Sequence, residues 1–197
     1  MGGNPHRLRR WLGLALFCLA LSLSLAGAKV QADSYDDRRV RTAARLLRAL
    51  LSADEQLEGK QSDSGTLQVW VWSDRPREAA PLLPLIAPPG DSARAKVRGL
   101  KLELKTLSEL PGAELAAPPV AIFLAQPLQQ SEFERLLGWC IEQQVILYSP
   151  FEGDVERGAT AGVSVQAKVQ PFVNLGTLRN SRISLRKFYL DHSRAQP

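Results

Sequence analysis

The sequence is poor in the residues that build metal centres and nucleophilic active sites. Its 197 residues include two cysteines and two histidines, and Cys18 and His6 lie in an N-terminal segment with the features of a leader. Cys140 and His192 are left for the rest of the chain. A single cysteine excludes an intramolecular disulfide, and with one peripheral histidine it cannot easily form a zinc site or a Cys/His dyad. We therefore expect no metal site and no cofactor.

The motifs of nucleotide-binding and hydrolytic enzymes are missing as well. The sequence has no Walker A loop, no GxGxxG after a strand and no GxSxG elbow. Acidic pairs such as Glu132 with Glu134, or Asp154 with Glu156, stand in polar segments, where carboxylates are usually solvated. The sequence thus predicts a protein that is not an enzyme and has no catalytic residues.

Residues 1–28 have the three regions of a secretory signal peptide. Three arginines between positions 7 and 10 precede an apolar run, Trp11–Leu25, and the small residues Ala26-Gly27-Ala28 suit cleavage after position 28, with position 32 as a second possibility. The alternative is an uncleaved membrane anchor, but the apolar run is shorter than the roughly 20 residues that a membrane-spanning helix needs. We expect a cleaved signal peptide, a periplasmic location and no membrane span after cleavage.

Removal of the signal peptide changes the charge of the protein. The full chain has 25 basic and 20 acidic residues, a formal net charge of +5. Cleavage after position 28 removes three arginines and no acids, which leaves 22 basic against 20 acidic residues, or +2. Nucleic-acid-binding proteins concentrate cationic charge on one face, so the sequence gives little support to a nucleic-acid partner.

The first element expected in the mature chain is an amphipathic helix over Arg38–Leu51. Apolar residues recur there at spacings of three and four, and five arginines occupy much of the remainder (Arg38, Arg39, Arg41, Arg45 and Arg48). The arginines are open to two interpretations, a binding surface for an anionic partner or membrane, and a solvated helix face. We prefer the solvated face.

Four apolar or alternating stretches predict strands: Thr66–Trp72, Leu100–Leu104, Val120–Ala125 and Val145–Tyr148. Prolines 81 and 84 limit the segment between the first two to short helical turns. A helix is expected within residues 126–144, with Ser131 and Glu134 as a capping box and Cys140 as a buried thiol on its inward stripe.

Two further short strands, residues 161–165 and 169–173, suit a hairpin, and residues 178–193 suit one or two helical pieces. The fold class that follows is α/β, a single domain over residues 36–193. We expect a mainly parallel, Rossmann-like sheet flanked by helices, without a nucleotide motif and with a C-terminal antiparallel hairpin and terminal helix.

Trp70 and Trp72 alternate with apolar residues on the first strand. Together with Trp139 they are candidates for stacking on a ligand. The alternative is burial beneath a packing helix, which is the more common position of such residues.

The C-terminal part of the chain resembles the YfiR/HmsC-like family of small periplasmic proteins. The resemblance rests on the order of short features, which are Glu156-Arg157-Gly158 in a loop, Gly162 in the hairpin, Phe172-Val173-Asn174 in its second strand, and Ile183-Ser184-Leu185 followed by Phe188-Tyr189-Leu190. The preceding strand and helix and the first helix are also similar in type and spacing, so the resemblance covers most of the mature chain. Leu50-Leu51-Ser52-Ala53-Asp54 replaces the family's aromatic-rich helix end, and the cysteine pairs of some members are absent.

The resemblance implies a non-enzymatic regulator that binds the periplasmic domain of an inner-membrane signalling protein and restrains a diguanylate cyclase, with an effect on cyclic-di-GMP and biofilm formation. It makes Glu156, Arg157 and Gly158 candidates for partner binding, and it allows a homodimer. An internal Arg157–Glu156 pair is an equal alternative, and Asn174 is expected to bond backbone at a strand-to-helix junction. The alternative function is an exported module that binds a small ligand or an envelope polymer and is unrelated to cyclic-di-GMP.

Overall fold

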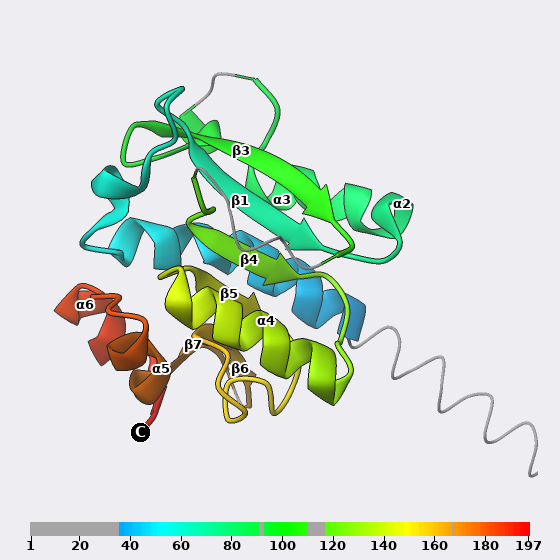
Figure 1. Ribbon diagram of the computed structural model, residues 1–197, viewed down its shortest axis with the longest axis vertical. Helices are drawn as coiled ribbons and strands as arrows, with labels where there is room; N and C mark the ends of the chain where they lie inside the picture. The colour runs from blue at the N-terminus through cyan, green and yellow to red at the C-terminus, as the bar shows by residue number, and fades with distance from the viewer. Residues whose placement is uncertain (1–35, 91–92, 110–116, 167) are drawn as a thin grey trace, which may run out of the picture. The chain divides into compact units, whose positions relative to one another are not determined.

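An eight-stranded mixed sheet organises the described part of the chain (Figure 1). The computed structural model describes residues 36–90, 93–109, 117–166 and 168–197, so the predicted signal peptide and both its cleavage positions lie outside the described residues. In spatial order the strands are β2 (Lys96–Val97), β3 (Leu100–Leu107), β1 (Leu67–Trp72), β4 (Ala121–Leu124), β5 (Ile146–Ser149), β6 (Ala161–Val165), β7 (Val169–Asn174) and β8 (Arg194–Gln196).

The pairing of these strands confirms the predicted fold class. β3, β1, β4, β5 and β6 run parallel to their neighbours, whereas β2 with β3 and β6 with β7 are antiparallel. The predicted hairpin is β6–β7, and the half-exposed strand β3 lies next to the sheet edge, as its alternation of leucines with charged residues indicates.

Helices cover both faces of the sheet. The first helix spans residues 36–53, and the others are α2 (Pro76–Ala79), α3 (Leu83–Ile86), α4 (Gln130–Glu142), α5 (Leu175–Asn180) and α6 (Lys187–Asp191), with 3-10 turns η1 (Leu57–Lys60), η2 (Ala80–Leu82) and η3 (Ala93–Ala95). α4 lies on the opposite face of the sheet from the first helix (Figure 1). Among the residues described, no helix has both the length and the apolar character needed to cross a membrane.

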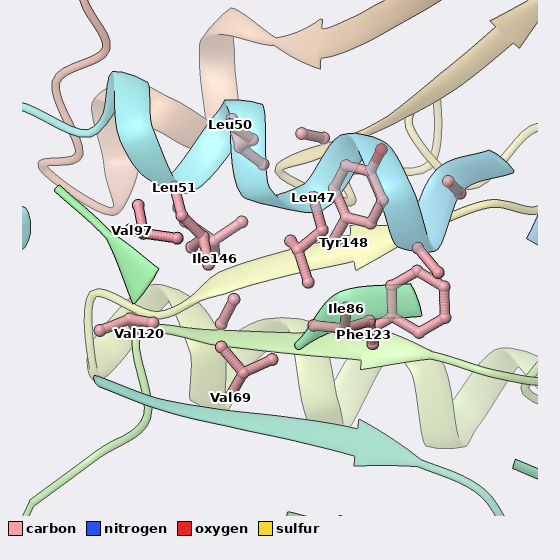
Figure 2. Packing of buried hydrophobic residues seen from close by; sticks show 14 of the residues in the cluster. Leu47, Leu50, Leu51, Val69, Ile86, Val97, Val120, Phe123, Ile146 and Tyr148 are labelled. Atoms are coloured by element: carbon pink, nitrogen blue, oxygen red, sulfur yellow. The ribbon is translucent and has the colours of Figure 1, made fainter. Parts of the chain in front are cut away.

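The first helix packs its apolar stripe onto the central strands. Leu47 and Leu51 point toward Ile146 of β5 and the neighbouring strands (Figure 2). The side chains of Leu47, Leu50, Leu51 and Ile146 are all fully buried. Burial of one such side chain stabilises the fold by roughly 1.5 to 3 kcal/mol before entropy is subtracted. This packing confirms the amphipathic helix and accounts for much of the core on this face.

The opposite face is closed by α4. Phe133, Leu136 and Cys140 are buried there against a second apolar cluster that includes Trp70. The prediction of a buried thiol is confirmed, and burial raises the pKa of Cys140 far above its ordinary value. The predicted capping box is wrong, because α4 begins at Gln130 and Ser131 therefore lies inside the first turn instead of preceding it.

The C-terminal segment differs from the prediction in one respect. It contains two short helices, α5 and α6, as expected, but the chain then returns to the sheet as β8, parallel to β7. The domain therefore continues past residue 193, the bound expected from the sequence. Arg182, with a left-handed φ of 54°, separates the two helices.

Gly162 allows β6 to approach β5 closely. A Cβ built on Gly162 would lie 2.2 Å from the backbone oxygen of Ser149 and 2.9 Å from Cγ2 of Val155. A backbone oxygen cannot move aside as a flexible side chain can. Position 162 therefore requires glycine for steric reasons, whereas a Cβ on Gly138 of α4 would meet nothing within 4 Å.

This contrast gives a prediction for two matched substitutions. Gly162→Ala should lower the free energy of unfolding by about 1 to 3 kcal/mol or more, because the methyl group forces the two strands apart. Gly138→Ala should raise it by about 0.5 to 1 kcal/mol, because alanine loses less backbone entropy inside a helix. Urea unfolding followed by circular dichroism measures both, and equal stability of the two variants would contradict the close approach.

Candidate partner-binding site

The candidate site is the loop of residues 150–160, which joins β5 to β6 and contains Glu156, Arg157 and Gly158. β6 pairs with β5 over two positions, Tyr148 with Ala161 and Ser149 with Gly162. β6 thus starts where β5 ends, so the loop joins two parallel strands without the crossover helix that usually returns the chain along the sheet.

A buried carboxylate holds the loop from within. Oδ2 of Asp154 accepts a hydrogen bond of 2.6 Å from the Ser149 hydroxyl, and its Oδ1 accepts one of 2.8 Å from Nη1 of Arg157. The Asp154 side chain is 4% exposed. Burial raises the pKa of the Asp154 carboxyl, and the Ser149 hydroxyl and the Arg157 guanidinium act in the opposite direction.

Arg157 is therefore paired inside the loop, but with Asp154 and not with Glu156. Its guanidinium also lies over the ring of Phe133 in α4, 4.2 Å from the ring centroid. This cation–π contact and the ion pair together orient Arg157 toward the body of the domain. An internal ion pair was the alternative to partner binding for Arg157. Arg157 does form such a pair, but its carboxylate is that of Asp154.

Gly158 brings the loop against α4. Its φ of +118° lies in a region that favours glycine, and a Cβ there would lie 2.7 Å from Cδ2 of Leu137. The predicted role of Asn174 is confirmed, because Asn174 caps α5 by accepting from the Thr177 amide at 2.8 Å, and its Nδ2 donates to the Val155 carbonyl at 2.8 Å. The loop is thereby fixed to both α4 and the β7–α5 junction.

Two carboxylates of the same loop stay accessible. The Glu152 side chain is 87% exposed and accepts a 3.3 Å contact from Nη1 of Arg39, while the half-exposed Glu156 lies 4.0 Å from Nη2 of Arg194. Both contacts are long and both carboxylates are open to water, so the two pairs contribute little to stability. The loop thus presents Glu152 and Glu156 on a scaffold that Asp154 and Arg157 hold.

Arg39 is the residue of this region that the sequence interpretation missed. It was expected on a solvated helix face, but its side chain is 8% exposed and its Nη2 donates to the Val163 carbonyl at 3.1 Å. Residue 39 stands one turn before Ala43 on the inward stripe of the helix. That spacing is the signal that would have separated it from the other arginines.

Trp70 and Trp72 are placed in the core. Trp70 stacks on Trp139 of α4 with a centroid distance of 6.2 Å, and the side chains of Trp70 and Trp72 are both buried. Burial beneath a helix was the alternative to a ligand-stacking role for these residues. Because both side chains are buried, neither presents the open ring face that stacking on a ligand requires.

The described residues contain no group of three or more His, Cys, Asp or Glu side chains that could hold a metal ion. In doubly wound sheets the usual ligand position is the crevice where the strand order reverses, here between the carboxyl ends of β1 and β4. The Gln126 side chain spans that position and accepts hydrogen bonds from the Ser73 hydroxyl at 3.3 Å and the Asp74 amide at 3.0 Å.

No protein-family model and no curated protein matches this chain. Among solved structures, the chain is similar to the ABC domain in complex with L-Trp from Streptococcus pneumonia, with a TM-score of 0.48 and 12% identity, over 79% of this chain and 59% of that one. It is also similar to a conserved domain protein from Vibrio cholerae O1 biovar eltor, with a TM-score of 0.46 and 13% identity, over 70% of this chain and 57% of that one. The chain spans less than two thirds of either structure.

The geometry predicts different effects for two residues of the loop. Arg157→Met keeps most of the apolar stem of the side chain but removes the guanidinium that pairs with the buried Asp154 carboxylate, so the free energy of unfolding should fall by about 1 to 3 kcal/mol at pH 7. The raised pKa of Asp154 should rise further in the variant. Its carboxyl then becomes neutral as the pH falls through that pKa, so the loss should shrink toward pH 4.

Urea unfolding of the variant and the parent protein at the two pH values tests this expectation. Glu152→Gln is the matched control, because it removes a charge that is exposed to solvent, and it should change stability by less than about 0.5 kcal/mol. A loss for Arg157→Met that is the same at both pH values would show that Asp154 is not the group that depends on it.

Proposed function

We propose that this protein is a non-enzymatic periplasmic regulator that binds the periplasmic part of an inner-membrane signalling protein and restrains a diguanylate cyclase. The sequence resemblance to the YfiR/HmsC-like family supports the class of function. The observation that supports a particular contact surface is the β5–β6 loop. Asp154 and Arg157 fix its backbone, while Glu152 and Glu156 remain accessible.

A loop that is already ordered suits a regulator of this kind. Binding by a flexible loop must offset the conformational entropy of the residues that become ordered, whereas a fixed loop avoids most of that loss. Restraint also requires the regulator to bind one conformation of the receptor better than the other. A preference of 1.4 kcal/mol corresponds to about a tenfold bias, which a small number of well-placed charges can supply.

In this proposal the residues of the family-like Glu156-Arg157-Gly158 run have different tasks. Glu156 contacts the receptor, together with Glu152, because both carboxylates are accessible. Arg157 and Gly158 shape the loop through Asp154, Phe133 and the contact with Leu137. Substitution of either would weaken receptor binding indirectly, through the position of the loop backbone.

The test is the cyclic-di-GMP content of a strain that lacks the gene. Deletion should raise cyclic-di-GMP, and the intact gene should restore the original level. The double variant Glu152→Lys, Glu156→Lys should fail to restore it, because like charges placed opposite a basic receptor surface weaken binding by at least about tenfold. Glu78→Lys in α2, which reverses an exposed carboxylate away from the loop, is the matched control and should restore it.

Immunoblots and circular dichroism establish that all variants accumulate and fold. No change in cyclic-di-GMP on deletion would remove the basis of the proposal. Restoration by the double variant at equal abundance would leave a regulator whose contact surface lies elsewhere.

A further inference from the structure

Two guanidinium groups from opposite ends of the chain converge on one strand. Arg39 lies in the first helix and Arg194 begins β8, yet Arg39 donates to the carbonyl of Val163 and Arg194 approaches the hydroxyl of the next residue, Ser164, at 3.3 Å. The Arg194 guanidinium also lies over the ring of Phe172, 4.4 Å from its centroid. Both cations are therefore held in place by contacts that do not involve a carboxylate.

The two guanidiniums line one small cavity. It has a volume of about 60 Å³, and its walls come from the β5–β6 loop, from β6 and from Phe172 of β7. The Arg39 side chain is more than nine-tenths buried, and its Nε is a buried donor without a hydrogen-bond acceptor among the described residues. The Arg39 atom that faces the loop is Nη1, whose carboxylate partner Glu152 lies at 3.3 Å. A buried cation with so long a contact to its carboxylate, at a polar cavity, is the arrangement that binds an anion.

Two carboxylates of the loop now stand at this cavity, and both are held loosely. Glu152 and Glu156 line it with Arg39 and Arg194, at 3.3 and 4.0 Å between the closest charged atoms. Neither contact has the length of 2.7 to 2.9 Å that a strong charge-assisted hydrogen bond has. Because Glu152 is almost fully solvated, it can leave Arg39 for water with little loss of free energy.

We propose that this cavity is a carboxylate-binding site in which an incoming carboxylate group replaces Glu152 on Arg39 and is held from the other side by Arg194. A carboxylate group can enter this cavity from solvent while the rest of its molecule stays outside. Displacement of Glu152 frees that side chain and alters the charge that the loop presents. The incoming group is either a free small carboxylate or an acidic side chain of the receptor, and only the second source rests on the proposed function.

The experiment is an NMR titration of the purified protein with acetate and with succinate, read from the Nε–H signals of the arginines. Those of Arg39 and Arg194 should move saturably, and sodium chloride at the same ionic strength should not reproduce the movement. Glu152→Gln removes the competing carboxylate and should tighten binding about two- to fivefold, the range expected from the value of an exposed ion pair. Arg194→Gln should weaken it at least about fivefold.

Glu78→Gln is the control for loss of an exposed carboxylate elsewhere and should leave the affinity unchanged. Arg39→Gln is a less suitable variant, because Arg39 also supports the fold through Val163. Arg194→Gln tests the proposal without that complication. The proposal is overturned if neither probe moves the two signals saturably in the parent and Glu152→Gln proteins, or if Glu152→Gln binds acetate no better than the parent.

A second arm identifies the source of the carboxylate. If the receptor supplies it, saturating succinate should release the receptor's periplasmic domain from the immobilised protein, and Arg194→Gln should retain less of that domain. If succinate does not change receptor binding, the receptor is excluded as the source of the carboxylate. The ligand of the cavity is then a free small carboxylate. Since the NMR arm needs no receptor, failure of the cavity and failure of the proposed function remain distinguishable.

Discussion

The close parallel contact between β5 and β6 is the constraint on which the half of the molecule with the candidate site depends. The two strands pair at only two positions, so β6 begins beside the end of β5. A loop can therefore join them without a crossover helix. The loop must then satisfy its own polar groups near the sheet, and it does so with Asp154, a carboxylate buried between a hydroxyl and a guanidinium. Gly162 permits the approach, and β7, α5 and β8 all follow from where β6 is placed.

Four acidic or basic residues within six positions of this loop have different roles because they differ in burial. Asp154 and Arg157 form a pair whose anionic partner is withdrawn from solvent, and loss of the cation would leave a desolvated charge. Glu152 and Glu156 are of the same chemical type as Asp154, but their partners are distant and water competes with them. The stable pair keeps the loop in shape, and the weak pairs are available for exchange.

Much of the fold could be predicted from local patterns, and the residues that could not be predicted depend on distant partners. The first helix, β4, β5 and the hairpin have apolar periodicities that directly report which face is buried. β8 is Arg194-Ala195-Gln196, which has no such pattern and forms a strand because the edge of β7 offers it hydrogen bonds. Glu156 is a candidate from the sequence, whereas Glu152 is not, and for Arg39 the solvated helix face is preferred over an anion-binding surface. The proximity of Arg39 and Glu152 arises only after residues 113 positions apart are brought together. Similarly, the sequence does not indicate that Arg157 pairs with Asp154 in preference to Glu156.

The weakness of the Arg39–Glu152 contact has a consequence for binding that a strong pair would not have. An internal ion pair that competes with a partner lowers the affinity of the partner by the free energy of the internal pair, so a buried, short pair would close the site. A long pair whose carboxylate is solvated subtracts little, yet it places opposite charges together when no partner is present. Arg39 remains fixed by Val163 and Arg194 by Phe172, so the cations need no reorganisation when the carboxylates change places. Exchange at this surface therefore depends on how strongly each of two carboxylates, both reached by water, pairs with Arg39. Added salt should weaken the intermolecular pair more than it weakens the buried Asp154–Arg157 pair that shapes the loop.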